Sequence, residues 1–102
     1  MSNNFGVSTK FQIFNYRNPS EGTRRCNAIA VKLGKLTLYF SYNTVVAFKI
    51  DDKFYVSENC FSATTAQHIR AVESYEGQAN GNRLPREIFE ETLAQHLAER
   101  GI

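Results

Sequence analysis

The sequence predicts an α+β fold, in which an antiparallel meander of about five strands is followed by two C-terminal helices packed on one face of the sheet. The first observation is that residues 11–57 form short runs with apolar residues at alternate positions, separated by turn residues. The second is that the apolar spacing changes to that of helices after Ser57. The third is the length of 102 residues, which suits one hydrophobic core, so we expect a single domain over residues 1–102.

The composition excludes several classes of protein. Hydrophobic residues make up 42% of the chain and charged residues 22%, which is ordinary for a globular domain and excludes a disordered or fibrous protein. No apolar run approaches the roughly 18 residues that span a bilayer, and residues 1–10 are too polar for a secretory signal. We therefore expect a cytoplasmic protein without a membrane partner, with residues 1–10 as a loose N-terminal arm.

Two hairpin-forming strands are expected first. Residues 11–16 alternate in the manner of a strand and are followed by Asn-Pro-Ser-Glu-Gly at 18–22. Proline fixes φ, asparagine and serine bond locally to the backbone, and glycine permits positive φ, so this segment forms a turn. Residues 23–33 then form a second strand. Its core-facing residues are Ile29, Val31 and Leu33.

Three further strands complete the expected meander. Gly34-Lys35 forms the next turn, and Leu36, Leu38 and Phe40 alternate along the third strand. Residues 45–50 are an apolar, β-branched run. Asp51-Asp52 closes a tight hairpin into a fifth strand over residues 53–57.

Two helices follow the strands. Ser62 is a candidate N-cap for a helix over residues 63–75, and the glycine- and asparagine-rich residues 76–83 are an inter-helix loop. Pro85 suits the first turn of a second helix, which Gly101 ends. The apolar stripe of this helix comprises Ile88, Phe89, Leu93 and Leu97.

No motif identifies a reaction. Cys26 and Cys60 lack the spacing of a zinc site and are interpreted as structural thiols. Glu58, Cys60 and His68 could form a nucleophilic arrangement, but nothing in the sequence fixes their geometry. Phosphate-binding loops, dinucleotide fingerprints and metalloprotease motifs are absent. We therefore expect a protein that is not an enzyme and that uses no metal and no cofactor.

Basic and aromatic residues in the predicted sheet are the strongest functional signal. The net charge of +2 is small, but residues 1–56 carry +5 and the remainder −3. A sheet face with tyrosines and flanking arginines can stack bases and neutralise phosphates. Arg24, Arg25, Tyr39 and Tyr42 are the candidates for this role. With both helices on one face, the uncovered face would present Tyr39, Ser41, Tyr55 and Ser57.

Polar residues around the start of the first helix could form a second part of the site. Helix N-termini have unsatisfied amides that favour anions. The alternative is that these residues are turns and caps that satisfy their own backbone. The full set of candidate ligand-binding residues is Arg24, Arg25, Tyr39, Tyr42, Asn43, Thr44, Ser57, Asn59, Thr64, Thr65 and His68.

Four segments carry a resemblance to a known family. They read LYFSYNTVVAF at 38–48, VSEN at 56–59, SATTAQHI at 62–69 and RLP at 83–85. On these segments, over roughly residues 28–95, the chain resembles a family of small uncharacterised proteins encoded by bacteriophages and by some bacteria and archaea. The resemblance implies a viral accessory setting. It also implies that one motif contains Tyr42, Asn43, Thr44, Ser57, Asn59, Thr64, Thr65 and His68.

Two binding functions follow from these observations. The leading hypothesis is a non-enzymatic module that binds nucleic acid or a nucleotide. The alternative is a phage inhibitor of a host or antiviral-defence protein, such as a CRISPR component, with the acidic second helix or an exposed sheet edge as its interface. A second copy of the chain, forming a homodimer, is a further candidate partner.

Overall fold

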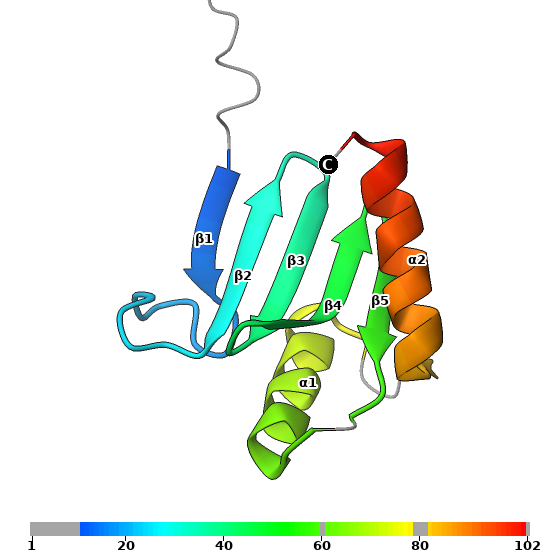
Figure 1. Ribbon diagram of the computed structural model, residues 1–102. Coiled ribbons are helices and arrows are strands. Elements are labelled where there is room, and N and C mark those ends of the chain that lie inside the picture. The colour runs from blue at the N-terminus through cyan, green and yellow to red at the C-terminus, as the bar shows by residue number, and fades with distance from the viewer. Residues whose placement is uncertain (1–10, 60, 79–81, 102) are drawn as a thin grey trace, which may run out of the picture.

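The α+β fold is confirmed by a computed structural model, which describes residues 11–59, 61–78 and 82–101 (Figure 1). A six-stranded sheet follows the chain order β1-β2-β3-β4-β5-β6. The strands are β1 (Phe11–Asn15), β2 (Ala28–Leu33), β3 (Leu36–Ser41), β4 (Thr44–Ile50), β5 (Lys53–Ser57) and β6 (Arg83–Leu84). The helices are α1 (Ala63–Tyr75) and α2 (Arg86–Glu99). The expected N-terminal arm at residues 1–10 lies outside the described residues.

The expected five-stranded antiparallel meander is confirmed, and a short sixth strand joins it. β6 pairs parallel to β5, with Val56 opposite Arg83 and Ser57 opposite Leu84. The loop expected over residues 76–83 is therefore corrected at its end, because Arg83 belongs to this strand; residues 79–81 lie outside the described part. The Arg83 side chain donates to Glu73 of α1 at 2.9 and 2.7 Å, which ties the strand to the helix.

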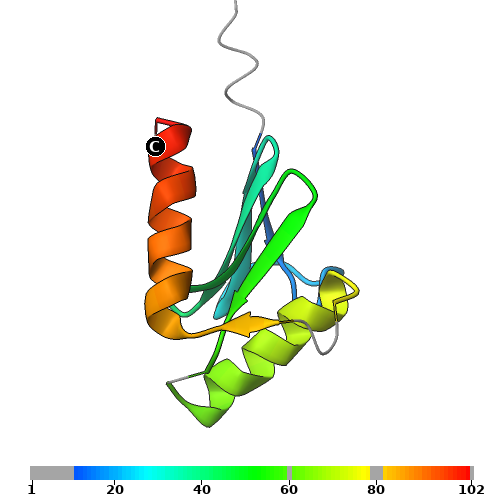
Figure 2. The same ribbon diagram turned by 90° about the vertical axis from the view of Figure 1, so that its right-hand side faces the viewer.

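The two helices cover opposite faces of the sheet, which corrects the prediction that both pack on one face (Figure 2). Ile69 and Val72 of α1 pack in one core cluster, and Phe89 of α2 packs in another. Strand β4 contributes to both clusters, with Val46 and Ala47 in the first and Phe48 and Ile50 in the second, so its apolar run reflects burial on both faces rather than on one. Between α1 on one face and α2 on the other, the chain passes through β6, which is the edge strand of the sheet.

The residues expected on an uncovered face are buried or half-buried instead. Tyr39 is 1% exposed and packs in the α1 cluster, where its ring lies edge-on to Tyr16 at 5.5 Å. Ser41 and Ser57 are also buried. Tyr55 packs against the α2 side, with its ring 5.6 Å from His96. These positions are covered because each helix takes a different face.

A β-bulge shapes the β3–β4 hairpin. Tyr39 pairs with Ala47 and Phe40 with Val45, which leaves Val46 as the extra residue. Val46 is fully buried in the α1 cluster. Beyond the bulge, Ser41 pairs with Thr44, so Tyr42 and Asn43 form the turn at the end of the sheet where α1 begins (Figure 1).

Candidate functional site: an arginine hollow at the start of helix α1

Three segments surround a hollow of about 750 Å³ at one end of the sheet. They are the connection between β1 and β2, the β3–β4 turn and the first turns of α1. Five of the residues singled out from the sequence line it together, and we call this site the arginine hollow. These five are Arg24, Arg25, Tyr42, Thr64 and His68.

The hollow has an excess of positive charge. Arg17, Arg24 and Arg25 line it with one carboxylate, that of Glu21. All three arginines are exposed. Within the part of the chain that the structure describes, none of them forms an ion pair. Their guanidinium groups are therefore available to an anion, and guanidinium binds phosphate through two parallel hydrogen bonds.

Asn15, at the end of β1, holds the arginine-bearing connection in place. Its side-chain Oδ1 accepts hydrogen bonds from the backbone N–H of Arg17 at 3.0 Å and of Asn18 at 2.8 Å. Its Nδ2 donates to the carbonyl of Gly22 at 3.4 Å. The side chain is buried, so these bonds satisfy it and fix the loop locally. Neither Asn15 nor Arg17 was among the predicted ligand-binding residues, although Arg17 is one of the basic residues interleaved with aromatic residues in the predicted sheet. The available signal was an asparagine that ends an alternating strand just before a proline-containing turn.

Two residues of the arginine hollow have left-handed backbones. The φ angle is +59° at Arg25 and +58° at Tyr42. This region is uncommon for bulky residues, and its persistence at a tyrosine costs conformational free energy. The N–H of Tyr42 donates to the carbonyl of Asn27 at 2.8 Å, which joins the turn to the arginine-bearing connection. As a result the Tyr42 side chain is held at the hollow with 53% of its surface exposed.

A chain of hydroxyl groups runs from the start of α1 to His68. Ser62 caps the helix by accepting from the Thr65 N–H at 3.1 Å, and its hydroxyl donates to Thr65 Oγ1 at 3.2 Å. Thr65 Oγ1 lies 3.1 Å from Ser41 Oγ, which lies 2.7 Å from His68 Nδ1. If each hydroxyl donates to the next group, every hydroxyl proton is used. In that direction Ser41 donates to Nδ1, and the imidazole proton is on Nε2.

His68 is 2% exposed and lines the arginine hollow beside Tyr42, with the two ring centroids 5.8 Å apart. Burial, and secondarily the positive charge of Arg17, lowers the pKa of His68, so the ring is neutral at pH 7. No hydrogen-bond partner of Nε2 is present among residues 11–59, 61–78 and 82–101. The buried ring therefore has a donor left over at the hollow.

The remaining candidates lie elsewhere. Tyr39 was expected to face a ligand, but it is buried in the core and its hydroxyl donates to Glu76. Ser57 is fully buried and donates to the carbonyl of Glu58 at 2.8 Å. Asn43 and Thr44 line a different surface, shared with α2. Asn59 bonds the backbone of residues 61 and 62, which confirms the turn interpretation at this position.

Of the two cysteines, Cys26 lies in the part of the chain that the structure describes. Cys26 is half-buried, and its Sγ accepts from the Ala28 N–H at 3.3 Å. Cys60, and with it the nucleophilic arrangement, lies outside the described residues. Within residues 11–59, 61–78 and 82–101, no three metal-ligating side chains cluster. None of the helices described is both long and apolar enough to span a membrane.

A family model matches residues 3–91, which include every residue of the arginine hollow. The chain belongs to DUF8033, a family of unknown function. No curated protein and no solved structure matches the chain.

Proposed function

We propose that this protein is a non-enzymatic module that binds single-stranded nucleic acid in the arginine hollow. The observation that carries the proposal is that Arg17, Arg24 and Arg25, unpaired within the described chain, surround one exposed tyrosine, Tyr42. This combination of cations and an aromatic ring is the one that single-strand binders use.

Each part of the hollow has a role in this proposal. The arginines bind backbone phosphates, and the Tyr42 ring stacks on a base. The His68 Nε2–H donates to a phosphate or base oxygen without adding charge, since the lowered pKa keeps the ring neutral. A volume of about 750 Å³ is of the size that small-molecule sites have, so it suits a nucleotide unit of a longer strand.

Single strands suit this surface better than a duplex. The stacking ring lies in a recess rather than on a projecting helix or ribbon, and duplex readout requires an element that enters a groove. An unpaired strand can turn a base onto the Tyr42 ring. The resemblance to small phage-encoded proteins supports an accessory role, in the cytoplasm of a host cell, that acts by covering a strand.

The test is fluorescence anisotropy with labelled single-stranded DNA, RNA and duplex DNA over a series of salt concentrations. We expect salt-dependent binding that is tightest for a single strand. Replacing Arg24→Gln and Arg25→Gln together should weaken binding and lower the slope of log K against log salt by about 1.4, at about 0.7 for each phosphate that is no longer neutralised. Lys53→Gln with Arg70→Gln is the matched control, because it removes the same charge from exposed positions outside the hollow.

Two results would reject the proposal. One is the absence of binding to any of the three nucleic acids at low salt. The other is equal loss of affinity in the hollow variant and the control variant, which would assign the binding to net charge alone.

The second candidate function is binding to a host or antiviral-defence protein through α2. Glu87 and Glu91 are exposed on this helix, as is Ile88, an apolar residue at 46% exposure. In this proposal Ile88 provides the apolar centre of the interface, and the two carboxylates belong to its polar rim. Replacing Glu87 and Glu91 by lysine should abolish complex formation with such a partner while the sheet remains folded, and retention of the complex would reject this interface.

A further inference from the structure

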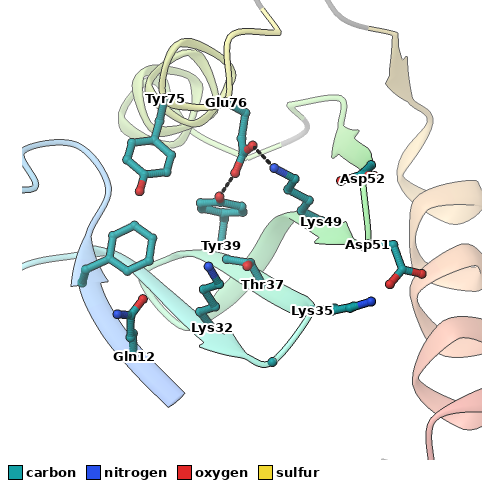
Figure 3. A pocket seen from close by; sticks show the side chains of 12 residues that line it. Gln12, Lys32, Lys35, Thr37, Tyr39, Lys49, Asp51, Asp52, Tyr75 and Glu76 are labelled. Atoms are coloured by element: carbon teal, nitrogen blue, oxygen red, sulfur yellow. Dashed lines mark hydrogen bonds and ion pairs between the residues drawn. The ribbon is translucent and has the colours of Figure 1, made fainter. Parts of the chain in front are cut away.

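A second hollow, of about 670 Å³, lies at the opposite end of α1 on the same face of the sheet (Figure 3). Its floor is a row of side chains in register across four strands. Gln12 pairs with Lys32, Lys32 with Thr37, and Thr37 with Lys49. Paired residues of neighbouring strands face the same side of a sheet, so all four side chains point toward the hollow. We call this site the lysine hollow.

Thr37, in the middle of the row, has a polar group without a partner. The residue is 6% exposed and lines the lysine hollow. No hydrogen bond to its hydroxyl exists among the described residues, although the hydroxyl of Tyr39, two positions along the strand, is bonded to Glu76. Buried hydroxyls are nearly always satisfied, because an unsatisfied one lowers stability. A hydroxyl left over between two lysines indicates a ligand that accepts its hydrogen bond.

The two lysines flank this hydroxyl and are held differently. Lys49 Nζ lies 3.1 Å from Glu76 Oε1, and the same carboxylate accepts from Tyr39, which positions the lysine over the floor (Figure 3). Lys32, on the other side of Thr37, is exposed and has no carboxylate partner in the described chain. Strands are spaced by about 4.8 Å, so the backbones of Lys32 and Lys49 are about 10 Å apart, which leaves space for an anion above Thr37.

The rim carries charges of both signs. Lys35 adds a third cation. Asp51 and Asp52 also line the hollow, and Asp51 pairs with Arg100 at 3.3 Å. In Figure 3 the two aspartates lie away from Lys32. The floor between Lys32 and Lys49 is therefore the part of the hollow suited to negative charge.

An aromatic wall stands beside the floor. Phe14 and Tyr75 line the hollow, with ring centroids 5.4 Å apart. Tyr75 is exposed, so its ring can meet a planar group of a ligand. The lysine hollow thus combines a site for an anion with a site for a flat apolar ring.

We propose that the lysine hollow binds a mononucleotide. The phosphate accepts hydrogen bonds from Thr37 Oγ1 and from the ammonium groups of Lys32 and Lys49, and the base lies against Tyr75. This site uses none of the residues of the arginine hollow, so it stands independently of the proposed nucleic-acid binding.

The experiment is an NMR titration of the ¹⁵N-labelled protein with AMP, and separately with inorganic phosphate, up to about 10 mM, which is above the dissociation constants of weak ligands. With AMP we expect shifts of the backbone amides of Lys32, Thr37, Lys49 and Tyr75. With phosphate we expect shifts of the first three only. Absence of AMP-induced shifts at these amides would overturn the proposal.

Thr37→Val is the decisive variant, because valine keeps the branched shape and removes the hydroxyl. We expect its melting temperature to equal or exceed that of the wild type, and its affinity for AMP to fall at least about fivefold. The matched control is Thr44→Val, at a half-buried strand position that lines neither hollow, and this change should leave AMP binding unchanged. Unchanged AMP affinity in Thr37→Val would overturn the proposal, and so would a lower melting temperature, since that would show a structural partner for the hydroxyl.

Discussion

The two hollows at opposite ends of α1 are constructed in different ways. The arginine hollow is formed by irregular segments, with its cations on a loop that Asn15 fixes through three hydrogen bonds. The lysine hollow is formed by regular strands, whose register alone brings Lys32 and Lys49 to either side of Thr37.

Each hollow also contains at least one feature that lowers stability. In the arginine hollow it is the left-handed backbone of Tyr42, at φ +58°. In the lysine hollow it is the buried Thr37 hydroxyl, for which the described chain provides no partner. At a position without a binding role, a residue with such a feature can be exchanged for a more stabilising residue with no loss of function. Strain and unsatisfied groups, more than net charge, therefore mark the candidate sites of this domain.

The largest effect is expected from replacing Asn15, whose side chain fixes the arginine-bearing loop of the arginine hollow. Asn15→Ala removes three hydrogen bonds from a buried side chain and should lower the free energy of unfolding by about 2–3 kcal/mol, as measured by urea denaturation. It should also weaken binding of single strands, because the arginines lose their fixed positions. AMP binding in the lysine hollow should persist.

Asn59→Ala is the control for this change. Its side chain also makes two hydrogen bonds to backbone, at 3.2 and 3.0 Å, but in an exposed turn. We expect a loss of about 1 kcal/mol or less and unchanged nucleic-acid binding. Equal losses in the two variants would show that Asn15 is an ordinary turn residue.

Tyr42→Asn should separate stability from binding within the arginine hollow. Asparagine tolerates positive φ, so we expect unfolding free energy equal to the wild type or higher by up to about 1 kcal/mol. Loss of the stacking ring should weaken binding to a single strand by about 1–3 kcal/mol. Calorimetric melting and anisotropy measure the two quantities. A destabilised variant with normal affinity would assign Tyr42 a purely structural role.

Tyr39→Phe should perturb the lysine hollow alone. The change removes the hydroxyl that donates to Glu76, so the Lys49–Glu76 pair loses one of its supports. We expect a loss of about 1 kcal/mol of stability, because Lys49 still partners the carboxylate, and weaker AMP binding. Single-strand binding should be unchanged, and a drop in it equal to that of AMP binding would contradict the separation of the two sites.

The smallest effect should be a shift of stability with pH from His68. Because the pKa of His68 is lowered on folding, the unfolded chain binds a proton more readily. The contribution of the neutral ring is complete above the ordinary value of 6.5 and is lost as the pH falls from there toward the lower folded value. The slope is at most about 1.4 kcal/mol per pH unit.

His68→Gln should remove that part of the pH dependence in urea denaturation between pH 7 and the onset of carboxylate titration. His96→Gln is the control, since His96 lies on the other face of the sheet, against Phe48 and Tyr55. An identical pH profile for the wild type and His68→Gln would show that the ring titrates freely in the fold.

Much of the fold was accessible from the sequence because its signals are local. The turn at 18–22 and the hairpins at 34–35 and 51–52 depend on residues whose backbone preferences are strong. The placement of α2 was not predicted correctly, although the apolar run of 45–50, broken by Lys49 alone, is typical of a strand covered on both faces. The two-residue β6 could not be predicted, since its pairing depends on where α1 delivers the chain.

The residues of the candidate sites also divide into those that the sequence predicts and those that depend on the three-dimensional arrangement. Arg24, Arg25 and Tyr42 were accessible from the sequence, because arginines and tyrosines within a predicted sheet are the residue types that bind nucleic acid. The prediction that Tyr39 lies on an open face was wrong, because its exposure depends on which face α1 covers. Thr37 could not be found, since an unpartnered hydroxyl is defined only by the residues around it.

Binding of a single strand at the arginine hollow is tested most directly by an NMR map of the bound protein. The wild-type protein, labelled with ¹⁵N, is titrated with an unlabelled single-stranded oligonucleotide at low salt. We expect the largest shifts at the amides of Arg17, Arg24, Tyr42 and His68, with small shifts at Glu87 and Glu91 on α2. Largest shifts on α2, or no shifts at the arginine hollow, would show that the strand does not bind there.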